Sequence, residues 1–83
     1  MKLPTAQASL TDTIRAAIEA AVPEARATVA GGGGHFTIEV VSPAFAGKTP
    51  VERQRLVYGA ITHLMKGDDA PVHAVDSLIT KPA

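Results

Sequence analysis

Three histidines are the side chains of this 83-residue chain best suited to bind a metal, and no cysteine is present to join them. His35, His63 and His73 are 28 and 10 residues apart, spacings that match no zinc signature. His63 falls inside a predicted helix, where an isolated histidine is most often an ordinary surface residue. His35 and His73 each lie at the start of a predicted strand. By residue type alone, both are expected to be surface histidines.

Basic side chains form one cluster, made by Lys48, Arg53 and Arg55. Such a cluster is usually a solvated face, and the alternative is contact with a partner or a phosphate. No Ser/His/Asp arrangement or pair of facing carboxylates is visible, and the aspartates at 68–69 belong to a predicted turn. We therefore expect a protein that is not an enzyme.

Four consecutive glycines at 31–34 formally satisfy the GxxG pattern with which KH domains clamp a nucleic-acid backbone. In KH domains that loop joins two helices, whereas here it would join two strands and has no basic residue beside it. We interpret the run as a β-hairpin tip, longer than a tight turn needs and therefore mobile or shaped for a contact. Anion capture by its backbone N–H groups is the alternative.

Length and composition indicate one small domain, expected at residues 9–80 between tails at 1–8 and 81–83. Eight basic and eight acidic residues cancel, which argues against strong nucleic-acid binding. No apolar run approaches the ~18 residues of a membrane span, and the amino terminus has no secretory h-region. We expect a soluble, cytoplasmic protein that does not associate with membranes.

Five elements are expected to position these side chains. A helix at about 10–21 should start at an N-cap on Ser9 and end before Pro23. Strands at 25–30 and 35–41 should form the hairpin, the second with clear period-2 alternation. A short link should then tuck Phe45 inward.

The second helix should start at Thr49, which forms a capping box with Glu52, and end at Gly67. Gly59 within it suggests close packing or a kink. The last strand, 72–80, is apolar on both faces and is therefore expected inside the sheet. The order α-β-β-α-β predicts an α/β (α+β) fold with a three-stranded mixed sheet, both helices on one face and the other face partly open.

With the elements laid out, the chain resembles the BolA-like protein family over about residues 10–80. The resemblance rests on HFTIEVVSPAFAGKTPVERQRLVYGAITHLM followed by PVHAV. The short glycine hairpin is closer to the compact bacterial branch, the IbaG- or YrbA-like members. The matching motifs are His35-Phe36, Phe45-Ala46-Gly47, Arg53-Gln54-Arg55, Val57-Tyr58 and Val72-His73-Ala74.

The resemblance implies a class II KH-like fold and a non-enzymatic adaptor in iron–sulfur cluster assembly, trafficking or iron regulation. Family members pair with monothiol CGFS glutaredoxins and share a bridging [2Fe–2S] cluster with the glutaredoxin cysteine and glutathione. By resemblance His73 is a cluster ligand, and a neutral imidazole suits such a role. Many relatives place a second ligand where this chain has Gly32, so His35 is the candidate to assist. Lys48, Arg53 and Arg55 would contact the partner or glutathione.

Two other functions remain open. The family is also linked to transcriptional control in stress and morphology responses, which would make DNA the partner and binding dependent on salt, Arg53 and Arg55. The third hypothesis is a protein-interaction module that does not bind metal. The isolated chain is expected to carry no cofactor and to be a monomer or a weak homodimer.

Overall fold

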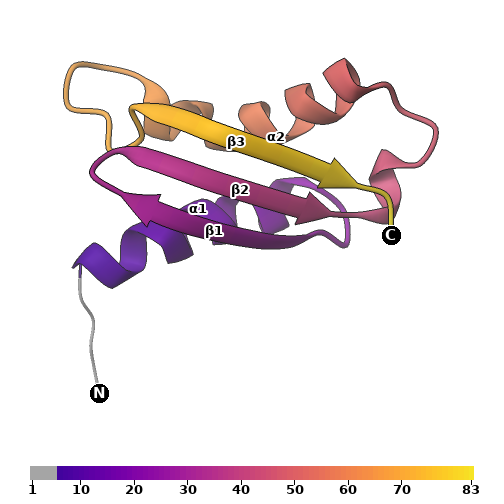
Figure 1. Cartoon of the computed structure of the whole chain (residues 1–83), viewed down its shortest axis with the longest axis horizontal. Helices are drawn as coiled ribbons and strands as arrows, with labels where there is room; N and C mark the ends of the chain where they lie inside the picture. Colours follow the sequence, from indigo (N-terminus) through magenta and orange to yellow (C-terminus); the bar gives the residue numbers. More distant parts are fainter. Residues whose placement is uncertain (1–5) are drawn as a thin grey trace.

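The computed structural model describes residues 6–83, with side chains from residue 10 onward, and places two helices over one face of a three-stranded sheet (Figure 1). β2 is the central strand, antiparallel to β1 and parallel to β3. This confirms the predicted α+β class, the mixed sheet and the one-sided placement of the helices. No helix in the described part of the chain is long and apolar enough to cross a membrane. The elements are α1 (Ala6–Ala21), β1 (Arg26–Gly32), β2 (His35–Val41), η1 (Pro43–Phe45), α2 (Pro50–Met65) and β3 (Ala74–Lys81).

The core lies between the helices and the sheet. The burial pattern of β2 shows how packing against this core determines which side chains face outward. Phe36, Ile38 and Val40 are at most 2% exposed, while His35 and Thr37 alternate with them and face outward. Because successive side chains of a strand point to opposite faces, burial of Phe36 fixes His35 on the open face. The other core residues at 1% exposure or less are Ile14, Ile18, Val22, Phe45, Val57, Ile61 and Val72.

The start of α1 differs from the prediction. α1 begins at Ala6, about one turn early, so Ser9 lies inside the helix rather than at its N-cap. Alanine and glutamine at positions 6–8 are strong helix formers, which explains why the helix extends past a residue able to cap it. Residues 1–5 of the predicted tail lie outside the described part of the chain. The predicted end of the helix, before Pro23, is confirmed.

The capping of α2 is confirmed. The Glu52 N–H donates to Thr49 Oγ1 at 3.2 Å, and the Thr49 N–H donates to Glu52 Oε1 at 2.9 Å. Gly67 follows the helix with φ +90°, the left-handed conformation that favours glycine after a helix end. Of the two alternatives for Gly59, close packing is wrong, because a Cβ there would meet nothing within 4 Å.

β3 is an edge strand, so the prediction that it lies inside the sheet is wrong. Its register with β2 shifts by one residue: Phe36 pairs with Val75, but Thr37 pairs with Ser77, which leaves Asp76 as an extra, bulged residue. The bulge changes which side chains share a face, and Val75 and Leu78 both pack against the core. The sequence of β3 looked apolar on both faces for two reasons. The bulge lets Val75 and Leu78, which are three residues apart, face the same side, and Ile79 is 47% exposed on the other side.

Ser42 ties three segments together at the end of β2. It is fully buried, and its hydroxyl donates to the Pro23 carbonyl at 2.6 Å and accepts from the Ala44 N–H at 3.0 Å. Its backbone N–H donates to the Lys81 carbonyl at 3.0 Å, and its carbonyl accepts from the Ala83 N–H at 3.2 Å. Residues 81–83, predicted as a tail, are thus hydrogen-bonded to the sheet.

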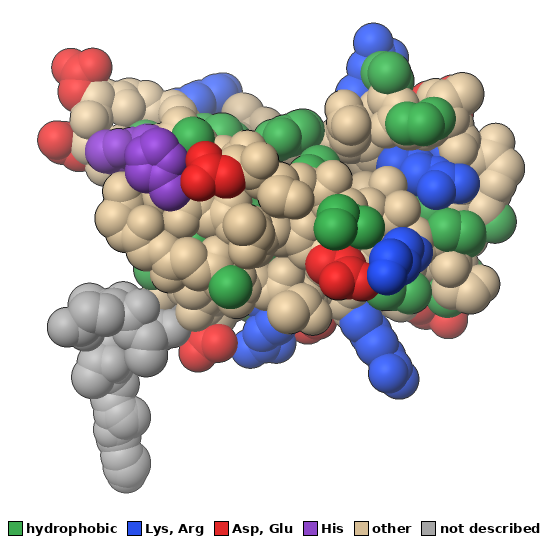
Figure 2. Space-filling model, in the orientation of Figure 1, with side chains coloured by type: hydrophobic (Ala, Val, Ile, Leu, Met, Phe, Trp, Pro, Cys, Tyr) green, Lys and Arg blue, Asp and Glu red, His purple; other side chains and the backbone are tan. Residues whose placement is uncertain are grey.

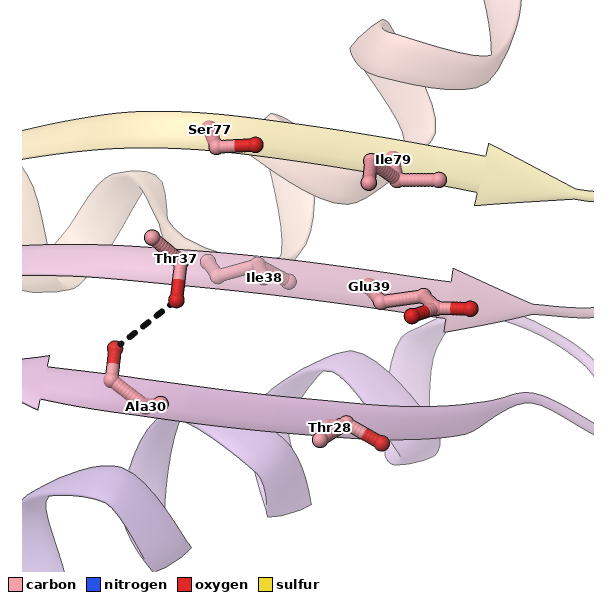
Figure 3. A pocket seen from close by; sticks show the side chains of 7 residues that line it. All are labelled: Thr28, Ala30, Thr37, Ile38, Glu39, Ser77 and Ile79. Carbon is pink, nitrogen blue, oxygen red and sulfur yellow. Dashed lines mark hydrogen bonds between the residues drawn. The ribbon is translucent and has the colours of Figure 1, made fainter.

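The second face of the sheet carries no helix and is lined by a mixture of polar and aliphatic side chains (Figure 3). Its shallow hollow, about 160 Å³, contains one side-chain hydrogen bond among the drawn residues, from Thr37 Oγ1 to the Ala30 carbonyl at 3.5 Å. No ionisable groups other than Glu39 line it. The face therefore offers little chemistry, and the reactive side chains lie at its ends. The lining residues are Thr28, Ala30, Thr37, Ile38, Glu39, Ser77 and Ile79.

Candidate functional site

The glycine run forms a tight turn that supports one end of the sheet. Gly31 and Gly32 belong to β1, and Gly32 pairs with His35, so Gly33 and Gly34 alone make the turn. Their φ values of +63° and +85° are those of a type I′ turn, which requires positive φ at both central residues. The expectation of a tip longer than a tight turn is wrong, because two of the glycines continue the strand.

The turn contacts the segment that leads into β3. This agrees with the interpretation of the glycine run as a hairpin tip shaped for a contact. The Gly34 carbonyl accepts hydrogen bonds from the N–H groups of His73 at 2.8 Å and Ala74 at 3.0 Å. A Cβ on Gly34 would lie 2.8 Å from His73 Cγ and 2.9 Å from Nδ1, which is closer than real Cβ contacts allow. Gly34 is buried while His73 is exposed. The imidazole of His73 therefore rests on a glycine surface and stays accessible from outside.

His35 is held by a different contact. Its Nδ1 lies 3.2 Å from Oδ1 of Asp76, the bulged residue of β3. Both side chains remain more than half exposed, at 59% and 56%. A surface pair of this kind adds little stability, so its main effect is on the orientation of the ring.

The two outer histidines lie at the same end of the molecule, because His35 pairs with Ala74 and His73 bonds to Gly34. Figure 2 shows histidine side chains gathered at this end, beside an acidic side chain. We call His35, His73 and Asp76 the histidine end. Among residues 6–83, no three histidine, aspartate or glutamate side chains are grouped closely enough to hold a metal ion by themselves. What the chain offers is two accessible imidazoles, and a metal bound there needs further ligands from a partner.

His63 does not join this arrangement as a third ligand. It is exposed in the last turn of α2, where a cationic or polar side chain is favourable near the helix carbonyls.

The basic cluster lies at the opposite end of the sheet, at the start of α2 (Figure 1). Arg53 Nε donates to the Lys48 carbonyl at 3.0 Å. Lys48 and Arg55, with Glu52 and Leu56, line an open hollow of about 300 Å³. We call Lys48, Arg53 and Arg55 the basic end. The 16 residues of α2 separate the two ends by roughly 24 Å.

Two residues that position the histidines of this end were not singled out from the sequence. Gly34 was one of four equivalent glycines, and Asp76 was one member of a strand whose apolar residues fall on both faces, so that its alternation is poor. The poor alternation was itself the available signal, because a bulge shifts the side-chain period of a strand. Its position beside His35, 41 residues away, depends on strand pairing and had no local signature.

Sequence comparisons find relatives of one kind. A model of the family described as "BolA-like protein" matches residues 9–82. The chain is 38% identical over 58 residues to an uncharacterised protein from the rpoN-murA intergenic region of Acinetobacter guillouiae, covering 70% of this chain and 68% of that protein. It is 40% identical over 57 residues to mouse BolA-like protein 1, covering 69% of this chain but only 39% of the mouse protein.

Solved structures agree with these matches. A bolA homologue from Coxiella burnetii superimposes with a TM-score of 0.69 and 35% identity, covering 86% of this chain and 88% of that one. The BolA domain of SufE1 from Arabidopsis thaliana superimposes with the same TM-score and 27% identity, covering 89% and 92%. The family match over nearly all described residues and the shared fold lead to one conclusion: this chain belongs to the BolA-like protein family.

Proposed function

We propose that this protein is a non-enzymatic adaptor that pairs with a monothiol CGFS glutaredoxin and holds a bridging [2Fe–2S] cluster as shared cargo. The observation that carries the proposal is His73, an exposed imidazole whose ring lies against Gly34 and whose backbone N–H donates to the Gly34 carbonyl. A ligand that is already oriented loses less side-chain entropy when it binds a metal presented by a partner.

The side chains present at the histidine end fit an incomplete, partner-dependent metal site. Imidazole is a suitable iron ligand, and histidine in place of thiolate on one iron raises the potential of a [2Fe–2S] centre. His73 would be the main ligand and His35 would assist. Gly32, at the position where the family resemblance implies a second ligand, lies exposed in β1 with nothing within 4 Å of a Cβ, so it contributes space and no donor.

The basic end would contact the same glutaredoxin at a second place. A glutathione bound to the cluster would sit near His73, whereas Lys48, Arg53 and Arg55 lie about one helix length away. We therefore assign these three residues to the protein partner rather than to glutathione. Their positive charge would speed the encounter of the two proteins more than it strengthens the final complex.

Reconstitution with a CGFS glutaredoxin, glutathione, iron and sulfide tests the proposal. We expect a heterocomplex whose visible absorption and circular dichroism differ from those of the glutaredoxin alone. His73→Ala should abolish that difference, because the ligand on one iron is lost. His63→Ala is the matched control, since His63 is also exposed but lies in α2, and it should leave the spectra unchanged.

Binding of the apo proteins, measured by calorimetry, separates the ligand role from the partner role. If His73→Ala leaves both the spectra and the affinity unchanged, His73 is not a ligand. If the wild-type chain shows no binding to the glutaredoxin with or without cluster, the adaptor function itself is wrong.

A further inference from the structure

The bulge in β3 leaves one carboxylate, that of Asp76, without a partner residue on β2. In a continuous register, Asp76 would pair with Thr37, but the register shift gives that position to Ser77. Asp76 and Ser77 are both exposed, and Asp76 lies beside His35 with its Oδ1 3.2 Å from Nδ1. The bulge therefore leaves Asp76 beside His35 and not opposite Thr37, and bulges commonly re-aim a side chain.

This contact decides which nitrogen of His35 carries the proton. An ionised carboxylate only accepts hydrogen bonds, so Nδ1 must be the donor in the Asp76 contact. In a neutral imidazole, the other nitrogen, Nε2, then holds the lone pair. Carboxylates often fix metal-binding histidines in this tautomer and orientation.

The two histidines are positioned in different ways. Among the described residues, the ring of His73 makes no side-chain hydrogen bond and is located by the surface of Gly34. The ring of His35 is located by its contact with Asp76. Asp76 is thus the polar side chain that selects a ring nitrogen of His35.

We infer that Asp76 is a positioning residue that holds His35 as the Nδ1–H tautomer, with Nε2 free to bind iron presented by a partner. The claim about the His35 tautomer concerns the isolated chain. The claim that Nε2 binds iron rests on the proposed function. Asp76 does not itself touch the metal in this arrangement. Its removal should weaken the shared site only through His35.

The tautomer is measured first, in the isolated protein without iron. Long-range ¹H–¹⁵N NMR at alkaline pH, where free imidazole is neutral, reports which ring nitrogen of His35 is protonated. We expect the Nδ1–H form in the wild type and a shift toward the Nε2–H form in Asp76→Ala. Asp76→Asn, which keeps a side-chain oxygen acceptor, should partly restore the wild-type form. A wild-type His35 with its proton on Nε2 would overturn the inference.

The effect on metal is measured second, as the rate at which the reconstituted heterocomplex loses its cluster to a chelator. Asp76→Ala should accelerate the loss about 10-fold, the lower range for removing a carboxylate behind a ligating histidine. His35→Ala should have at least that effect, and adding Asp76→Ala to it should change nothing further. Glu39→Ala is the control, because Glu39 makes a similar exposed ion pair, with Lys81 at 3.0 Å.

These outcomes separate the inference from the proposed function. If His73→Ala destroys the cluster signal but Asp76→Ala changes neither tautomer nor cluster loss, the adaptor function stands and the role of Asp76 is wrong. If no heterocomplex forms at all, the proposed function and the iron part fail, while the NMR result still decides whether Asp76 sets the tautomer. Additive effects of Asp76→Ala and His35→Ala would also contradict action through His35.

Discussion

The histidine end and the basic end differ in how far along the chain their contacts reach. At the histidine end, the glycine turn and His35 meet residues 73–76, and the Asp76 contact spans 41 positions. At the basic end, the bonds of Thr49 with Glu52 and of Arg53 with Lys48 span at most five positions. The first end fixes side-chain geometry through tertiary structure, while the second displays charge on a locally capped helix. Substitutions at the histidine end should therefore alter side-chain geometry and cluster binding. Substitutions at the basic end should alter stability or the rate of association with the partner.

The largest effect should come from Phe45, the buried side chain beneath the basic end. Phe45 is fully buried, and its carbonyl accepts a hydrogen bond from the Lys48 N–H at 3.1 Å. Phe45→Ala should lower the free energy of unfolding by about 3–5 kcal/mol, a large part of the roughly 5–15 kcal/mol expected for a domain. Urea denaturation followed by far-UV circular dichroism measures this loss.

Phe45→Leu is the companion variant, and it should retain most of that stability because it leaves a smaller cavity. Removal of the exposed His73 should change the same free energy by no more than about 0.5 kcal/mol. Equal losses for Phe45→Ala and His73→Ala would mean that packing does not anchor the basic end.

Next in size is the effect of a methyl group in the glycine turn. Gly33 and Gly34 both have positive φ, so alanine at either position should cost about 1–2 kcal/mol in backbone strain. Only Gly34→Ala also drives a Cβ into the His73 ring, so it should lose more stability than Gly33→Ala.

The NMR signals of the His73 ring provide the second measurement on this pair. They should move in Gly34→Ala and stay close to wild type in Gly33→Ala, and cluster binding should weaken in the first variant alone. If the two variants are indistinguishable, the turn does not position His73.

A smaller effect is expected at the cap of α2. Thr49→Ala removes the acceptor of the Glu52 N–H and should cost about 1 kcal/mol in urea unfolding, while Thr49→Ser should be close to wild type. The cluster spectrum of the heterocomplex should not change, because the cap lies at the other end of the molecule. A changed spectrum in the folded variant would show that the two ends are coupled.

The smallest change in stability is expected for Arg55→Ala, within about 0.5 kcal/mol, because Arg55 is exposed. Its effect should instead appear in stopped-flow association with the glutaredoxin, several-fold slower at low salt and nearly equal to wild type at high salt. Arg26→Ala, an exposed arginine on β1, removes the same charge elsewhere and should affect the rate less. If the two variants slow association equally, the rate depends on the net charge of the protein and not on the position of Arg55.

Local signals predicted much of the fold. The capping box at Thr49 and Glu52 uses bonds between residues three apart, and the alternation in β2 reflects one buried face, so both are visible in a short window. The early start of α1 was missed because helix-forming residues precede the expected cap at Ser9. The edge position of β3 was missed because a bulge shifts its pattern.

The candidate site was less predictable than the fold. His73 was singled out by family resemblance, and its residue type and position in the sequence did not distinguish it from any surface histidine. The contacts that give His73 and His35 their orientations come from Gly34 and Asp76, and both depend on the pairing of β2 with β3. A register shift of one residue disturbs the side-chain pattern of β3, but that pattern does not show which residue of β3 comes to lie beside His35.

The parallel pairing of β2 with β3 also sets when the histidine end can form during folding. These strands are joined through α2, so their contacts close a long loop, and such non-local contacts are typically made late. Until they form, His35 has no Asp76 beside it and His73 has no glycine turn beneath it. A chain still being synthesised, or one with β3 detached, would carry two independent histidines and no paired binding surface. Under the proposed function, the site for metal shared with a partner would then form only on completion of folding.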